Sequence, residues 1–297
     1  MSILSLRNVV KQYHNHRAVD SVTFDVQKQK IFGLLGPNGA GKTSLIRIIT
    51  TITGADEGDV IIDGEPLNEY HPSSLGYMPE ERGLYKKMKV GDHLMYLAQL
   101  KGLSKKEARQ KIGHWLKKFD IENWWNKKIE ELSKGMQQKI QFIATVVHDP
   151  KLIIFDEPFS GLDPINTNLI KEEIRKLRDN GTSIIFSTHR MEQVEEICED
   201  IVLINEGKVI LEGNVDEIKH RFKENLYRIE FDGEIQSDFA GFDIQTRTDT
   251  SITIKLPQET DGNELIKYAV ATGTHIVSFN EILPTLNEIF IKQVEQN

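Results

Sequence analysis

Short apolar runs alternate with longer amphipathic stretches along the first 219 residues of the chain. The runs at 31–35, 152–155 and 183–186 are almost wholly apolar, as strands are when both faces of a sheet are covered. The stretches between them have the wider spacing of apolar residues that is typical of helices. This alternation predicts an α/β fold built around a largely parallel sheet.

Two regions depart from this pattern. Residues 4–9 and 19–26 alternate between apolar and polar side chains, which predicts half-exposed antiparallel strands in a separate β layer. Residues from about 86 to 150 are rich in Lys, Glu, Leu and Trp at helical spacing, so we expect a helical subdomain before the strand at 152. Its tryptophans are interpreted as packing groups: Trp115, Trp124 and Trp125.

The chain changes character after a hairpin near 201–208. The basic stretch at 219–223 marks the predicted boundary between a main domain, 1–219, and a C-terminal domain, 220–297. Short strands and two helices alternate in the second part, which predicts a small α+β domain. The apolar face of the last helix, predicted at 285–295, is expected to dock on that domain's own sheet.

The composition is that of an ordinary globular protein. Of the 297 residues, 39% are hydrophobic and 28% are charged, and the formal net charge is −8. A negative charge argues against broad binding to nucleic acid or anionic lipid, so nucleic acid is not an expected partner. The start of the chain resembles no secretory signal, and no apolar run approaches the roughly 20 residues of a spanning helix. We therefore expect a cytoplasmic protein.

A glycine-rich loop between a strand and a helix is the first candidate for chemistry. It follows the strand at 31–35 and reads Gly36-Pro37-Asn38-Gly39-Ala40-Gly41-Lys42-Thr43-Ser44. Glycines let successive backbone N–H groups converge on a phosphate at a helix N-terminus, which is how a P-loop works. Lys42 would place a positive charge at the β- and γ-phosphates, and Thr43 would offer its hydroxyl to Mg²⁺. The loop predicts a nucleoside triphosphate site.

A second apolar strand ends in two carboxylates. Asp156 and Glu157 follow the run at 152–155, at the sheet edge where the P-loop is also expected. We predict that Asp156 holds Mg²⁺ and that Glu157 is the general base, which activates a water for attack on the γ-phosphate. Without the glycine-rich loop, the same pair could equally be interpreted as an exposed acidic end of a strand with no catalytic role.

Residues 1–219 resemble the ATP-binding subunits of ABC transporters, whose motifs occur here in the family's order. The segment Leu132-Ser133-Lys134-Gly135-Met136 is similar to the signature loop, although Lys134 and Met136 replace the usual Gly and Gln. The resemblance implies that Ser133 and Gly135 reach the γ-phosphate bound by an opposite subunit. A helix N-terminus aimed at an anion is consistent with that role.

Three more residues match the family by position. Asp163, in Ser160-Gly161-Leu162-Asp163, resembles the D-loop that communicates between the two nucleotide sites of a dimer. His189 follows the strand at 183–186 and resembles the switch histidine that contacts the γ-phosphate during catalysis. Tyr13 resembles the aromatic residue that stacks on adenine, and a core tyrosine is the alternative interpretation.

Glu80 is the largest departure from the family pattern. It stands where the family usually has the glutamine of the Q-loop, and we assign it to the Mg²⁺ site. The segment Glu80-Glu81-Arg82-Gly83-Leu84-Tyr85 resembles a subgroup linked to sodium and drug export, whose members carry a small domain after the ATPase. Residues 220–297 resemble that domain. Residues near 80–84 would also line the groove that receives a membrane partner.

The resemblance implies an ATPase with ATP and Mg²⁺ as cofactors. It implies a homodimer, or a heterodimer with a second ATP-binding subunit, held at the cytoplasmic face of the cell membrane by a membrane-spanning permease subunit. Export is the expected direction of transport. One alternative is a soluble ABC ATPase acting on ribosomes or DNA, but tandem cassettes and a long coiled coil are missing. Another is a P-loop GTPase, but Asn126-Lys127-Lys128-Ile129 lacks the Asp of a guanine-reading element.

Overall fold

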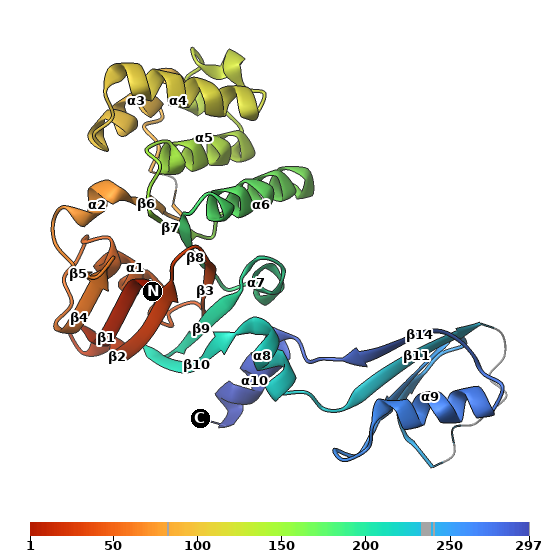
Figure 1. The fold of residues 1–297 in the computed structure, drawn as a ribbon. Helices are drawn as coiled ribbons and strands as arrows, with labels where there is room; N and C mark the ends of the chain where they lie inside the picture. Colours follow the sequence, from red (N-terminus) through yellow and green to blue (C-terminus); the bar gives the residue numbers. More distant parts are fainter. Residues whose placement is uncertain (82, 233–238, 240, 297) are drawn as a thin grey trace. The chain divides into compact units, whose positions relative to one another are not determined.

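The computed structural model describes residues 1–81, 83–232, 239 and 241–296 (Figure 1). The chain divides into two compact units, Met1–Asn214 and Val215–Asn297. The division lies a few residues before the predicted boundary at 219, because helix α8 (Val215–Arg221) groups with the second unit. Among the described helices, none combines the length and the hydropathy that a bilayer crossing requires.

A six-stranded sheet of mostly parallel strands forms the centre of the first unit, in the order β10-β9-β3-β8-β7-β6. Its strands are β3 Ile31–Leu35, β6 Leu75–Met78, β7 Leu152–Asp156, β8 Ser183–Thr188, β9 Asp200–Asn205 and β10 Lys208–Asn214. Every residue of β3, β7 and β8 is buried, which explains their mostly apolar sequences. The three predicted central strands are confirmed.

A four-stranded antiparallel layer shares one core with this sheet and with helix α1 (Lys42–Ile49). Its order is β2-β1-β4-β5, formed by β1 Ser2–Tyr13, β2 His16–Gln27, β4 Glu57–Ile62 and β5 Glu65–Pro66. Leu4 and Phe24 of the layer, Leu45 of α1 and Ile154 of β7 belong to the same buried cluster. The predicted layer is confirmed, and the shared core fixes α1 together with the loop before it.

Three helices between residues 86 and 150 form a separate helical group in Figure 1. They are α3 Val90–Leu100, α4 Lys105–Lys118 and α5 Lys134–Val146, with 3₁₀ turns at Glu122–Trp124 and Ile129–Glu131. Trp115 is buried, and its ring centroid lies 5.8 Å from those of Phe119 and Phe142, so it packs the core as predicted. The other helices of this unit are α2 His71–Ser74, α6 Pro164–Asp179 and α7 Met191–Ile197.

The second unit is the predicted small α+β domain. Its sheet has the order β12-β13-β11-β14, from β11 Leu226–Asp232, β12 Asp243–Arg247, β13 Ser251–Lys255 and β14 His275–Ile282, and its longer helices are α9 Gly262–Ala271 and α10 Leu286–Gln296. Ile229, Ile252 and Ile254 of the sheet form a core with Leu265 and Ala269 of α9. The predicted fold class, an α/β core with an antiparallel layer, a helical subdomain and an α+β appendage, is confirmed.

The prediction that the last helix docks on its own sheet is wrong. The described core of the second unit contains residues of α9 and none of α10, so the apolar face of the sheet is already occupied. Lys292 of α10 instead makes an ion pair with Glu224, in the segment between α8 and β11. Figure 1 accordingly shows α9 along the sheet and α10 near α8.

Because the first unit has its own core, a chain shortened to residues 1–214 is expected to fold alone. ATP should bind it within about threefold of its affinity for the full chain, a difference below ~0.7 kcal/mol. Isothermal titration would give both affinities, circular dichroism would check the fold, and a chain ending at 219 is the matched control. A folded 1–214 chain without ATP binding would contradict this expectation.

Candidate active site

The loop that joins β3 to α1 is curled tightly because two of its glycines lie against other backbone atoms. A Cβ added at Gly36 (φ 150°) would lie 2.2 Å from the Ile204 carbonyl oxygen, and one at Gly41 (φ 108°) would lie 2.2 Å from that of Ala18. Neither position has room for a larger residue. α1 begins at Lys42 with no acidic residue in its first turn, so its positive N-terminal end is available to an anion.

Lys42 is a buried cation, 9% exposed. Its Nζ donates to two carbonyl oxygens of its own loop, at 2.7 and 3.0 Å. Burial lowers the pKa of Lys42, and the nearby carboxylates of Glu157, Asp156 and Glu80 oppose that shift. Three carboxylates from two other segments therefore act on one ammonium group.

Asp156 ends β7 and is 6% exposed. Its carboxylate accepts a hydrogen bond of 2.8 Å from the Ser187 hydroxyl on the neighbouring strand β8. Burial raises the pKa of Asp156 and the carboxylates of Glu80 and Glu157 raise it further, while the Ser187 hydrogen bond and Lys42 lower it. A metal cation beside Asp156 would keep it ionised, which suits a carboxylate that binds a metal.

A cavity of about 700 Å³ brings four of the predicted residues together. Its lining includes Tyr13, Thr43, Glu80 and Asp156, which come from β1, α1, the segment after β6 and the end of β7. The Thr43 hydroxyl and the two carboxylates suit a magnesium ion that takes its remaining ligands from phosphate and water. In the described parts of the chain, no group of three or more His, Cys, Asp or Glu side chains could hold a metal unaided.

Glu157 turns sharply out of β7. Its φ of 50° lies in the left-handed region that non-glycine residues rarely adopt, and its N–H donates to the Ser187 carbonyl oxygen at 2.9 Å. Its carboxylate accepts hydrogen bonds from the Thr188 hydroxyl (3.0 Å) and the His189 N–H (2.9 Å), and lies 2.6 Å from the His189 Nδ1. The structure thus pairs the predicted base with the predicted switch histidine. Sequence reasoning missed Ser187 and Thr188, although both directly precede His189.

The predicted residues of the signature-like loop and of the D-loop-like segment do not line this cavity either. The Ser133 hydroxyl accepts a backbone N–H in the first turn of α5 at 3.3 Å, and the Asp163 carboxylate accepts one in the first turn of α6 at 2.9 Å. The hydrogen bond at α6 lowers the pKa of Asp163. A Cβ at Gly135 would lie 3.9 Å from the Gly161 carbonyl oxygen. The signature-like loop is therefore next to the D-loop-like segment of the same chain.

The remaining predicted residues lie at the edges of the site. Tyr13 is 37% exposed, so it is not a core tyrosine, and the Lys11 ammonium lies 5.6 Å from its ring centroid. Among the other positions of the P-loop-like segment, Pro37 is half-buried, Asn38 and Gly39 are exposed, and Ala40 is buried. Ser44 lies in the first turn of α1.

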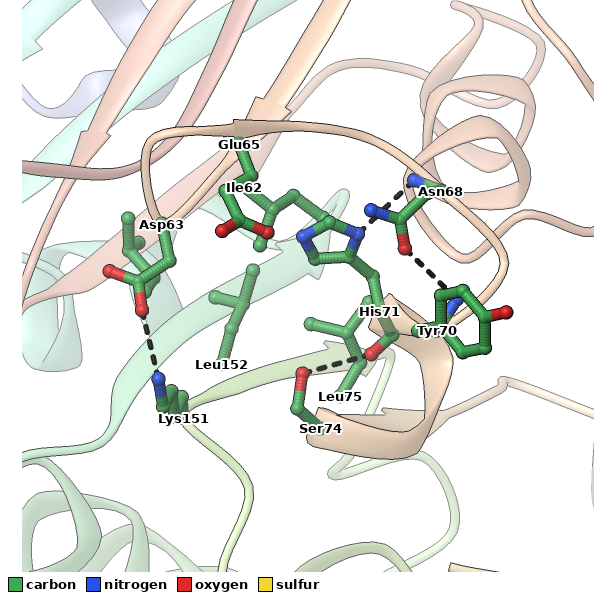
Figure 2. A pocket seen from close by; sticks show the side chains of 11 residues that line it. Ile62, Asp63, Glu65, Asn68, Tyr70, His71, Ser74, Leu75, Lys151 and Leu152 are labelled. Carbon is green, nitrogen blue, oxygen red and sulfur yellow. Dashed lines mark hydrogen bonds and ion pairs between the residues drawn. The ribbon is translucent and has the colours of Figure 1, made fainter.

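A second pocket, of about 320 Å³, lies at the other end of the strands and contains none of the predicted residues (Figure 2). It is lined by Leu75 and Leu152, the first residues of β6 and β7. Several of its polar groups are paired with each other or with the backbone, among them Lys151 with Asp63 at 2.9 Å and the His71 Nδ1 with a backbone N–H at 3.1 Å. Figure 2 shows these pairs facing one another, and we assign the pocket no chemistry.

Two family models match the chain. The model described as ABC transporter matches residues 19–160. The model described as ATP-binding protein DrrA1-3-like, C-terminal domain, matches residues 213–294. The second match covers nearly all of the second compact unit, so it supports the predicted likeness of the appendage to that subgroup.

The chain is also similar to individual ABC proteins. It is 43% identical over 294 residues to the uncharacterized ABC transporter ATP-binding protein YhaQ of Bacillus subtilis, with 98% of each chain covered. It is 32% identical over 224 residues to the lipopolysaccharide export system ATP-binding protein LptB of Escherichia coli, covering 73% of this chain and 93% of LptB. A solved ATP binding subunit of an ABC transporter superposes with a TM-score of 0.70 at 29% identity, covering 74% of this chain and 93% of that one. From this nearly full-length similarity and the site geometry, the chain belongs to the ABC transporter ATP-binding proteins, the family that hydrolyses ATP to power transport.

Proposed function

We propose that this ATP-binding subunit powers export through a separate membrane-spanning subunit, with MgATP bound between two ATP-binding subunits. The observation that carries the proposal is the convergence of Lys42, Thr43, Glu80 and Asp156 at the carboxyl ends of the central strands. Export is supported by the relative LptB, which is named for an export system. The cytoplasmic face of the membrane is the proposed location.

The proposed reaction is attack of a water molecule on the γ-phosphorus. Glu157 takes a proton from that water while the bond to the β-phosphate oxygen breaks, which releases ADP and phosphate. Lys42 and the N–H groups of its loop bind the β- and γ-phosphates and stabilise their charge. Thr43, Asp156 and Glu80 would hold Mg²⁺, which neutralises charge on the phosphate oxygens.

His189 is proposed to contact the γ-phosphate while it stays bonded to the base. Its ring lies 2.6 Å from the Glu157 carboxylate, and its side chain is 47% exposed. The imidazole can therefore reach a phosphate without disturbing the core, and it can hold the carboxylate beside the attacking water. Adenine would stack on the exposed ring of Tyr13.

Two subunits are proposed because residues 132–136 resemble the signature loop, which in the family reaches the γ-phosphate bound by an opposite subunit. Ser133 and Gly135 lie at the start of α5 and next to Gly161, not among the residues that line the cavity. The positive end of α5 suits an anion, and we propose that it meets the γ-phosphate held by a second subunit. Asp163, at the start of α6, would sit at the same interface.

A groove of about 440 Å³ is the proposed docking site for the membrane-spanning subunit. Its lining includes the apolar side chains of Leu84 and Leu97. Pro79 and Gly83 line both this groove and the 700 Å³ cavity. A segment of the partner that presses into the groove would therefore act on the residues on both sides of Glu80.

The Glu157→Gln variant tests the base assignment. The amide keeps the size of the carboxylate but cannot take up the proton, so we expect ATP binding within about threefold of wild type and turnover lower by at least ~10²-fold. An ATP-bound dimer should accumulate on size-exclusion chromatography. Phosphate release measures turnover, and Glu192→Gln, which changes an exposed residue in the first turn of α7, is the control. Turnover above about a tenth of the wild-type rate would assign the base role to another residue.

The Glu80→Gln variant tests the metal assignment. A glutamine offers a neutral carbonyl where Glu80 offers a charge, so the Mg²⁺ concentration for half-maximal ATPase activity should rise on the order of tenfold, or ~1.4 kcal/mol. Coupling to the membrane partner should also change. Glu81→Gln is the matched control, since Glu81 lines the same cavity. If the Mg²⁺ titration curves of Glu80→Gln and wild type coincide, Glu80 does not belong to the metal site.

A further inference from the structure

Helix α6 carries a buried lysine that the proposed reaction does not use. Lys171 lies midway along α6 and is 7% exposed. Its ammonium group makes an ion pair with Glu196 of α7, and it lies 5.5 Å from the centroid of the Phe159 ring. A buried ammonium is costly unless it is paired, so these two contacts fix where the side chain can be.

Phe159, one of the two residues that Lys171 contacts, belongs to the turn that carries Glu157. The Ser160 N–H donates to the Glu157 carbonyl oxygen at 3.1 Å, and the Leu162 N–H donates to that of Phe159 at 3.2 Å. Phe159 is itself buried, and its ring centroid lies 5.2 Å from that of Phe186 in β8. A shift of the Phe159 ring would therefore move a short hydrogen-bonded turn whose first residue is Glu157.

Glu196, the other residue that Lys171 contacts, belongs to the helix that follows His189. α7 begins at Met191, directly after the segment whose backbone and ring are bonded to Glu157. Arg175, one turn further along α6, donates to the Glu196 carbonyl oxygen at 3.2 Å. Lys171 is thus in contact with both segments that meet at the Glu157 carboxylate, one on each side.

We propose that Lys171 is a positioning residue for ATP hydrolysis: it holds the turn after Glu157 and the helix after His189 at a fixed separation. The inference rests on the proposed roles of Glu157 and His189. Because Lys171 touches neither nucleotide nor metal in this scheme, its loss should slow the chemical step and leave ATP binding intact. A misplacement of about 1 Å can cost up to ~10²-fold in rate.

The test compares Lys171→Met, Lys171→Arg and Glu196→Gln in the full chain. Methionine keeps the length and the contact with the Phe159 ring but removes the charge. Glu196 is 48% exposed, so water can solvate it when the pair is lost, and Glu196→Gln should fold even if Lys171→Met does not. Arg178→Met is the matched control, because Arg178 of α6 pairs with Glu199 at 2.9 Å, two turns further from the catalytic turn.

For Lys171→Met we expect kcat to fall about tenfold and KM for ATP to stay within about twofold. Glu196→Gln should lower kcat in the same way, the double variant should add little, and Lys171→Arg should keep at least about half of the wild-type kcat. Arg178→Met should leave kcat unchanged. The inference is overturned if Lys171→Met and Glu196→Gln keep the wild-type kcat. It is also overturned if Arg178→Met loses as much kcat as they do.

Measuring Glu157→Gln in the same assay separates this inference from the proposed function. If Glu157→Gln retains wild-type turnover, the base assignment fails and the role of Lys171 fails with it. If Glu157→Gln is inactive while Lys171→Met and Glu196→Gln are normal, the inference alone is overturned.

Discussion

The site depends on one electrostatic constraint: three carboxylates act on a single buried lysine. Burial lowers the pKa of Lys42 and raises that of Asp156, so burial alone would favour the neutral form of both. Their mutual attraction opposes both shifts, but Glu80 and Glu157 add further negative charge nearby. Around Lys42, three negative groups therefore outnumber the one positive group. A triphosphate alone would worsen the imbalance, and a divalent cation bound with it would offset part of the added negative charge.

The fold maintains this arrangement through the pairing of β7 with β8. Asp156 stands opposite Ser187 in the parallel register, so Thr188, the last residue of β8, and His189 after it lie beside Glu157. A left-handed backbone at a non-glycine residue costs about 1–3 kcal/mol. Hydrogen bonds to a charged group each contribute about 1.5–3 kcal/mol, so the donors of Thr188 and His189 can offset the strain at Glu157. A one-residue slip between these strands would separate the base from all of its donors.

The sequence predicted most of this arrangement because its main signals are local. Strand periodicity located β3, β7 and β8, and the spacing of glycines located the loop before Lys42. The hydrogen bonds that Glu157 accepts from Thr188 and His189 could not be read in this way, because they depend on which strand lies beside β7 and in what register. The prediction for α10 was wrong for a similar reason. The sequence shows the apolar face of this helix, but it does not show that α9 already covers the sheet.

The arrangement of the loops suggests how one nucleotide site could sense the other. Gly135, at the start of α5, lies next to Gly161, and Gly161 belongs to the same tight turn that begins at Glu157. A second subunit that approached the start of α5 or α6 would press on this turn, and only a few residues separate that contact from the base. The Lys171 ammonium lies 5.5 Å from the ring centroid of Phe159, which belongs to the same turn. In the proposed two-subunit arrangement, contact between subunits and the position of Glu157 would be connected within one short stretch of chain, so hydrolysis would depend on whether the second subunit is bound.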